Sequence, residues 1–225
     1  MTRDLPIFPL PVVLFPGAAQ ALHIFEPRYR QLLADCLESD RRFGIAYVPP
    51  VEDPAAAAVP DPGDVGCVAV IRSADRVPDG RGNILTEGER RFVLLEWLAA
   101  DRLYRVARVE EFEDALVLPD AEPLATQVRD AFGRVVRLQA TEAGPELSVP
   151  IDLPADPTAL SFHVAAEIEV DASTKRALQV ERDTSARLRR LLALLGPLLA
   201  EAEQRAAASL HARGNGRRQH SERAT

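Results

Sequence analysis

The sequence predicts an α+β protein in which a small antiparallel β-barrel with one inserted helix is followed by an α-helical bundle. Before Pro119, short apolar runs are separated by prolines and glycines, a pattern typical of strands. Some of these runs, such as residues 91–98, are apolar on both faces, which favours a closed or half-closed barrel over an open sheet. After Pro119 the apolar residues recur at helical spacing, which predicts a bundle.

The strands of the first half follow from these apolar runs and from the turn signals between them. Asp79-Gly80 is a strong tight-turn signal and predicts a hairpin, and residues 98–102 predict a second one. The expected strands are residues 5–8, 20–25, 43–48, 66–74, 82–88, 90–98 and 103–112.

One helix is expected within the β half, at residues 27–40, where apolar side chains recur at helical spacing after Pro27. Behind Pro119 we expect helices at residues 124–138, at 156–170, after a cap at Ser173, and at 184–212. Gly196-Pro197 predicts a kink in the last of them.

Three regions are therefore expected: a β-domain at residues 1–118, an α-helical subdomain at 119–213 and a disordered basic tail at 214–225. The chain of 225 residues is 47% hydrophobic, enough for a substantial core. Its net charge of -7 disfavours nucleic-acid binding, which needs a basic face.

The sequence also predicts a soluble, cytoplasmic protein. No apolar run reaches the roughly 18 residues that a membrane span requires, and no leader pattern is expected. Cys36 and Cys67 lack metal-ligand spacing and are interpreted as small buried hydrophobic residues in a reducing compartment.

The sequence shows no recognisable catalytic motif, so we expect a protein that is not an enzyme and that has no cofactor and no metal. The single lysine, Lys175, follows Thr174 rather than the glycine of an ATP-binding loop, and Ser173 two residues away does not face it on a helix. His163 and Glu167 share a helix face but are too few to hold a metal. Catalytic pairs that are distant along the chain stay open.

Ionisable residues are dense at residues 23–29, at the start of the first helix. His23 and Glu26 are a conceivable general acid/base pair, but no nucleophile or oxyanion hole accompanies them. Glu26 also suits the positive end of a helix dipole. We therefore interpret this stretch as a scaffold joint between strand and helix.

The first half of the chain resembles the LON substrate-binding domain, the N-terminal domain of the ATP-dependent protease Lon. The resemblance covers residues 5 to about 113. The motifs that carry it are Leu5-Pro6, Phe8-Pro9-Leu10, Phe15-Pro16-Gly17, Phe25-Glu26-Pro27-Arg28-Tyr29, Pro78-Asp79-Gly80 and Gly88-Glu89-Arg90-Arg91-Phe92.

This resemblance implies a PUA-like β-barrel followed by a helical subdomain. The family's domain is thought to recognise unfolded or tagged proteins, and a related domain lies in the substrate receptor cereblon. The protease's ATPase module and Ser/Lys peptidase domain have no counterpart in the sequence, so it is expected to be a free-standing LON-domain protein.

The leading functional hypothesis is a non-catalytic module that binds unfolded or exposed apolar segments of client or partner proteins. We expect the binding groove at the crevice between barrel and helices, because pockets favour such junctions. Its candidate lining residues are Phe8, His23, Phe25, Arg28 and Arg91. An adaptor that works with a Lon-type protease is the first alternative, and nucleic-acid binding, by fold analogy alone, is the second. The oligomeric state stays open.

Overall fold

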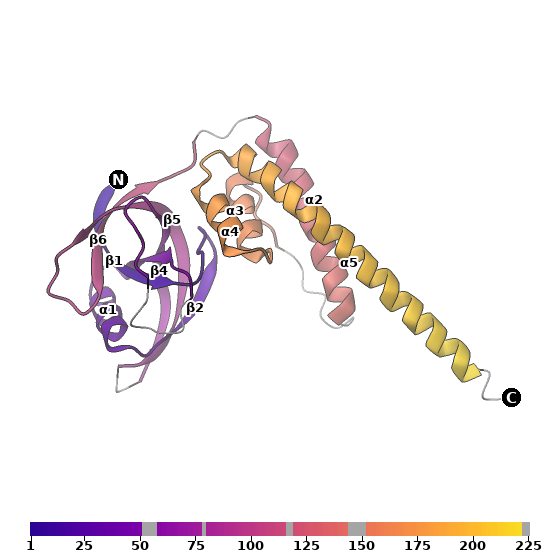
Figure 1. Cartoon of the computed structure of the whole chain (residues 1–225), viewed down its shortest axis with the longest axis horizontal. Helices are drawn as coiled ribbons and strands as arrows, with labels where there is room; N and C mark the ends of the chain where they lie inside the picture. The colour runs from indigo at the N-terminus through magenta and orange to yellow at the C-terminus, as the bar shows by residue number, and fades with distance from the viewer. Residues whose placement is uncertain (51–57, 78–79, 116–118, 144–151, 222–225) are drawn as a thin grey trace. The chain divides into compact units, whose positions relative to one another are not determined.

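A computed structural model describes residues 1–50, 58–77, 80–115, 119–143 and 152–221, and over these residues the chain has six strands and five helices (Figure 1). The predicted α+β class is therefore confirmed. In chain order the elements are β1 (Thr2–Leu10), β2 (Ala19–Ile24), α1 (Pro27–Leu37), β3 (Arg42–Tyr47), β4 (Val65–Arg76), β5 (Gly82–Leu98), β6 (Arg105–Phe112), α2 (Ala121–Ala143), α3 (Pro157–Glu167), α4 (Ala172–Val180) and α5 (Thr184–Ser221).

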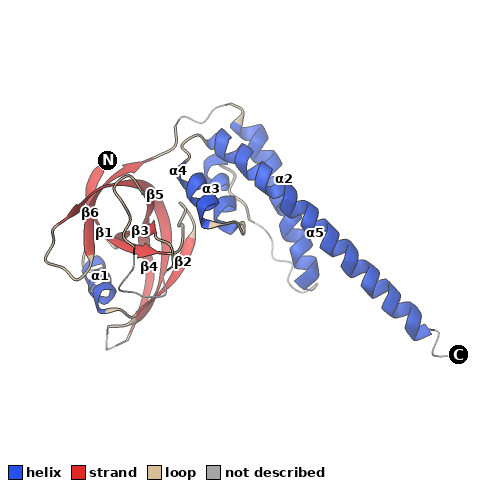
Figure 2. Cartoon of the chain, in the orientation of Figure 1, coloured by secondary structure: helices blue, strands red, loops and turns tan. Residues whose placement is uncertain are grey.

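The strands form one mixed sheet in the order β2-β5-β4-β3-β1-β6 (Figure 2). Strand β6 also pairs with β5, so the sheet curls back on itself, as the doubly apolar strands predicted. The prediction of a wholly antiparallel sheet was wrong at one pair, because β1 runs parallel to β3 with Ile7 opposite Gly44. Parallel neighbours need a long connection, and β2 and α1 lie within it.

Strand β5 joins two segments that the sequence predicted as separate strands. One edge of it pairs with β4, and the other edge pairs first with β2 and then with β6. Register shifts between Cys67 and Ala69 and between Leu94 and Glu96 accompany this change of neighbour. Bulges bend a strand and increase its twist, so one long strand can serve both neighbours.

Helix α1 begins at Pro27, as predicted, where the missing N–H costs no helical hydrogen bond. Its buried face includes Tyr29, Leu32 and Leu33, which pack in one cluster with Phe8 of β1. A second cluster gathers around Phe92 of β5. The apolar period of 27–40 therefore fixes which face of α1 covers the sheet.

Two of the family-like motifs lie against each other. Gly17 N–H donates to the carbonyl of Gly88 at 2.8 Å, and Gly88 N–H donates to Ala18 at 2.9 Å. A Cβ on Gly88 would lie 2.1 Å from the carbonyl oxygen of Phe15, so only glycine fits there. The two motifs thus hold the start of β2 against the middle of β5.

The chain divides into two compact units. The first comprises residues 1–116 and 162–183, so that the end of α3 and all of α4 group with the sheet. Within this unit, Gln179 donates to the carbonyl of Leu14 at 2.7 Å, and Arg176 forms an ion pair with Asp64 at 2.6 Å. Side-chain contacts therefore tie α4 to the β structure.

Arg91, on β5, makes a further buried link, with 2% of its surface exposed. Its guanidinium donates to the carbonyls of Gln179 and Glu181, at 2.7 and 2.6 Å, and forms an ion pair with Asp114. It also lies 4.5 Å from the ring centroid of Phe112. A buried guanidinium is tolerated when its donors are satisfied in this way.

The second unit comprises residues 117–161 and 184–225, and its described elements are α2, the start of α3 and α5. Leu188, Leu191 and Leu195 of α5 are buried, as the leucine stripe predicted. Arg187 is also buried and donates to Ser161 at 2.8 Å. The helix continues through Pro197 to Ser221, so residues 214–221 of the expected tail are helical, whereas 222–225 lie outside the described residues.

The predicted cap of α4 was wrong by two residues. Asp171 is the N-cap, and its carboxylate accepts from the N–H of Thr174 at 2.9 Å. The Ser173 hydroxyl donates to the same carboxylate. These hydrogen bonds hold the pKa of Asp171 well below its usual value. A carboxylate at the positive end of a helix accepts more strongly than a hydroxyl, which explains the choice.

Substitution of Arg91 by Met should lower the free energy of unfolding by about 3 to 5 kcal/mol, because it removes the buried guanidinium that binds the Asp114 carboxylate and two backbone carbonyls. Urea denaturation followed by circular dichroism measures the loss. The matched control is Arg90→Met, since Arg90 is adjacent and exposed. Equal stability of the two variants would contradict the structural role of Arg91.

Candidate functional site

A groove with a volume of about 860 Å³ lies entirely within the first unit. Its described lining comes from residues 7–11, 22–23, 25–26, 28–29, 48–50, 58–59, 98–100 and 102–105. The end of β1, the joint between β2 and α1 and the β5–β6 loop therefore supply most of its walls. The volume falls in the range of sites that hold small ligands or short peptide segments.

The floor of the groove is aromatic. Phe8 of β1 and Tyr29 of α1 are both buried, and their rings stack with centroids 3.8 Å apart. Burial raises the pKa of the Tyr29 hydroxyl, which the nearby Arg28 partly opposes. The stack belongs to the core cluster, so the floor is held rigidly by residues that also stabilise the fold.

The rim of the groove, by contrast, exposes apolar side chains. Phe25 is 58% exposed and Leu103 is 65% exposed, and both line the groove. The ring of Phe25 stacks on His23 at 5.8 Å, and His23 Nδ1 lies 2.7 Å from Asn83 Oδ1. Leu103 N–H donates to the side chain of Gln31 at 2.8 Å, which fixes its loop on α1.

Charged groups surround this apolar surface. Arg28 forms an ion pair with Glu26 at 2.8 Å, and Arg102 lies 3.6 Å from Asp35. The Tyr104 hydroxyl donates to Asp35 at 2.7 Å, and burial together with this hydrogen bond raises the pKa of Tyr104. The Arg105 guanidinium lies 5.7 Å from the ring centroid of Trp97.

The structure brings together four of the five predicted site residues. Phe8, His23, Phe25 and Arg28 all line the groove. Arg91 does not, because it is buried against α4. The groove is formed within the first unit, whereas the prediction had placed it at the crevice between barrel and helices.

The residues at the β5–β6 end of the groove were not among the predicted site residues. Leu103, Arg102 and Arg105 were assigned to a hairpin and its flanks, with no role in binding. A large apolar residue within a turn, as in the segment LAADRLYR, is the signal that would have drawn attention to them.

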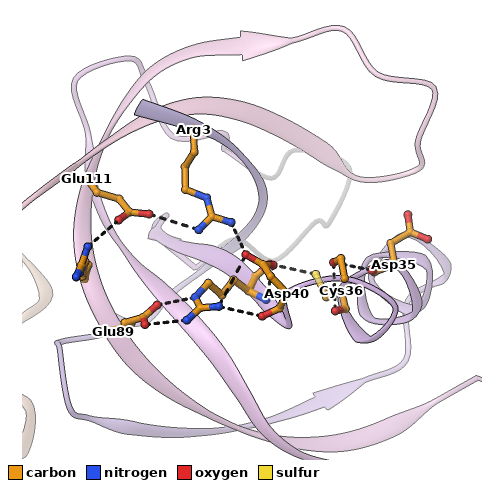
Figure 3. A network of polar contacts seen from close by, with 9 residues as sticks. Arg3, Asp35, Cys36, Asp40, Glu89 and Glu111 are labelled. Atoms are coloured by element: carbon orange, nitrogen blue, oxygen red, sulfur yellow. Dashed lines mark hydrogen bonds and ion pairs between the residues drawn. The ribbon is translucent and has the colours of Figure 1, made fainter. Parts of the chain in front are cut away.

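A separate network of polar contacts runs over β1, β3, β5 and β6. Figure 3 shows Arg3 between Asp40 and Glu111, and Glu89 beside a neighbouring guanidinium. That guanidinium is Arg42, which donates to Glu89 at 2.7 and 2.9 Å. The pairing lowers the pKa of Glu89, chiefly through the hydrogen bond from Arg42. Bidentate pairs of this kind fix strand geometry, so we interpret the network as structural.

Neither cysteine is placed to act as a nucleophile. Burial raises the pKa of Cys36 and of Cys67 to about 12, so both thiols stay protonated at neutral pH. Ser173 and Lys175 bind different partners. The Ser173 hydroxyl donates to Asp171, and the Lys175 amine donates to the carbonyl of Ala166.

Two statements apply to the part of the chain that the structure describes. It holds no group of three or more His, Cys, Asp or Glu side chains that could bind a metal ion. None of its helices is both long and apolar enough to span a bilayer.

Most of the chain is similar to known proteins. The sequence model of the ATP-dependent protease La (LON) substrate-binding domain matches residues 4–196. The chain belongs to this family. The Lon substrate-binding resemblance seen at residues 5–113 therefore extends into the helices, where the motifs are weak.

Curated relatives are full Lon proteases. Lon protease 1 of Thermus thermophilus is 28% identical over 197 residues, which are 85% of this chain and 24% of the relative. The Lon protease of Roseiflexus castenholzii is 29% identical over 196 residues, which are again 85% of this chain and 24% of the relative. This chain thus spans about a quarter of the length of these relatives.

Solved structures agree with the expected fold. A Lon N-terminal domain protein from Xanthomonas campestris is 26% identical, with a TM-score of 0.60, over 85% of this chain and 98% of that one. The N-terminal domain of the Mycobacterium avium complex Lon protease has a TM-score of 0.64 and covers 86% of this chain and 98% of that one. Because it is 20% identical, it supports the fold alone.

The Arg42–Glu89 pair predicts an acid-sensitive part of the stability. Because the pKa of Glu89 is lower in the folded chain than in the unfolded one, its contribution is complete above the ordinary pKa of 4.5 and is lost as pH falls through the folded value. Glu89→Gln should lower the free energy of unfolding at pH 7 by less than about 1 kcal/mol, since both side chains are partly exposed.

Urea denaturation at pH 7 and near pH 3 tests this pair. The difference between Glu89→Gln and the parent should shrink at the lower pH, whereas Glu110→Gln, at an exposed position of β6, serves as the control. A difference that persists unchanged at pH 3 would contradict the assignment.

Proposed function

We propose that this chain is a protein-binding module that holds unfolded or exposed apolar segments of other polypeptides in the groove. The observation that carries the proposal is the pair of exposed rim residues, Phe25 and Leu103, above the aromatic floor of Phe8 and Tyr29. Large apolar groups exposed together on a folded domain are typical of interaction sites.

We take the bound segment to be an extended chain, which can place apolar side chains on both exposed rim residues. A bound segment would bury apolar side chains against Leu103 and Phe25 while its backbone stays near the groove mouth. Each apolar group removed from water contributes about 25 cal/mol per Å², without any directional requirement. Such contacts favour apolar segments in general over one defined sequence.

Binding alone is the activity proposed for this site. The thiols are buried and protonated, and the Ser173 hydroxyl and Lys175 amine point to different partners. The matching family is itself described as a substrate-binding domain, which supports recognition rather than hydrolysis.

A second candidate is an adaptor that delivers bound segments to a Lon-type protease. The similarity to Lon proteases of Thermus thermophilus and Roseiflexus castenholzii favours it, since those proteins carry a related domain within one chain. Delivery requires a physical complex. Failure of the tagged chain to co-purify with a Lon-type protease, with client protein present, would remove this candidate.

Leu103→Ala should weaken the binding of a labelled, permanently unfolded protein by about fivefold, because it removes an apolar contact at the rim. Fluorescence anisotropy without ATP measures the affinity. The matched control is Leu95→Ala, since Leu95 is 40% exposed on β5 but does not line the groove.

Equal affinities for the two leucine variants would place binding elsewhere on the molecule. Absence of saturable binding to the parent protein would contradict the proposed function as a whole. The label is followed on a gel in the same experiment, and its cleavage would contradict a role by binding alone.

A further inference from the structure

We infer that the groove selects apolar segments whose neighbouring residues are acidic. This inference rests on the proposed function and adds a partner chemistry to it: an extended polypeptide in which Phe, Leu or similar side chains are flanked by Asp or Glu. It follows from the charges around the groove and from their spacing relative to the exposed apolar residues.

The described lining of the groove is positively charged although the chain as a whole is negative. The lining contains three arginines, Arg28, Arg102 and Arg105, and one carboxylate, Glu26. His23 also lines the groove. The net charge of the chain is -7. A cleft lined mainly by positive charges concentrates carboxylates locally and disfavours cationic partners.

Two of these arginines have donors to offer. Arg28 forms a close ion pair with Glu26, at 2.8 Å. Arg102 is half exposed, and its ion pair with Asp35 is longer, at 3.6 Å. Arg105 is exposed, lies on the ring of Trp97, and forms no ion pair with any carboxylate in the described ranges. A guanidinium has five N–H donors, so each can accept a partner carboxylate in the bidentate geometry that arginine favours.

Charged and apolar groups alternate at the rim. Leu103 lies between Arg102 and Arg105 along the loop, and Phe25 is next to Glu26 and close to Arg28. A segment that places an apolar side chain on Leu103 therefore carries its adjacent residues past a guanidinium. Successive residues of an extended chain are roughly 3.3 Å apart, which is within the reach of an arginine side chain.

A nucleic acid is the other ligand that arginines attract, but the groove suits a polypeptide better. Phosphate backbones bind where many cations gather, whereas here three arginines surround a floor of buried aromatic rings and an apolar rim. The net charge of -7 also repels a polyanion more strongly than it repels a short acidic peptide.

The test uses three fluorescent peptides that share one apolar centre and differ only in flanks of aspartate, serine or lysine. Anisotropy titrations with the whole chain at low salt should rank the affinities aspartate first and lysine last, and the ranking should flatten at high salt. The double variant Arg102→Gln/Arg105→Gln should weaken aspartate-peptide binding about tenfold and leave serine-peptide binding nearly unchanged.

The matched control is Arg72→Gln/Arg90→Gln, which makes the same change in net charge at exposed positions away from the groove. It should preserve the ranking. Equal affinities of the three peptides would overturn the acidic selectivity and leave the proposed function intact, whereas no binding of any peptide would overturn both. Loss of the ranking in the control variant, or displacement of the peptide by single-stranded RNA, would also overturn the inference.

Discussion

The single strand β5 is the constraint on which the first unit depends. Its 17 residues pair with β4 along one edge and with β2 and β6 along the other. Both exposed rim residues adjoin strands that pair with β5, since Phe25 follows β2 and Leu103 precedes β6. Arg91, in the middle of β5, ties α4 to the same strand. The groove is thus positioned by the most extensively paired element of the sheet, which limits how far its rims can move apart.

The residues that hold the fold and the residues proposed to bind are largely different. Gly88, Arg91 and Phe92 belong to one family-like motif, and all three are buried at close backbone approaches, ion pairs or the core. The proposed binding residues Phe25 and Leu103 sit on connections, where side chains are free to face solvent. This division is common where a rigid scaffold presents variable loops.

Features that depend on neighbouring residues were predicted from the sequence, whereas the pairing of distant strands was not. Proline at the first turn and the apolar period of 27–40 predicted α1, because both act within a few residues. The parallel β1–β3 pair, and the joining of two predicted strands in β5, depend on partners distant along the chain. Arg91 was taken for a groove residue because its burial depends on carbonyls of α4, about 90 positions away. Phe8, His23, Phe25 and Arg28 were candidates for a groove that was expected elsewhere, between barrel and helices. The β5–β6 end was missed because the hydrogen bond that holds its loop on α1 joins residues 72 positions apart.

The most direct test of the account is an NMR titration of the isotopically labelled chain with an unlabelled apolar peptide that has acidic flanks. Backbone amide shifts report where on the protein the peptide binds, independently of any affinity model. The account predicts that the perturbed amides concentrate at residues 22–29 and 98–105, with little change on α2 and α5. Perturbations confined to the helical unit, or spread over the sheet without the rims, would contradict the groove as the binding site.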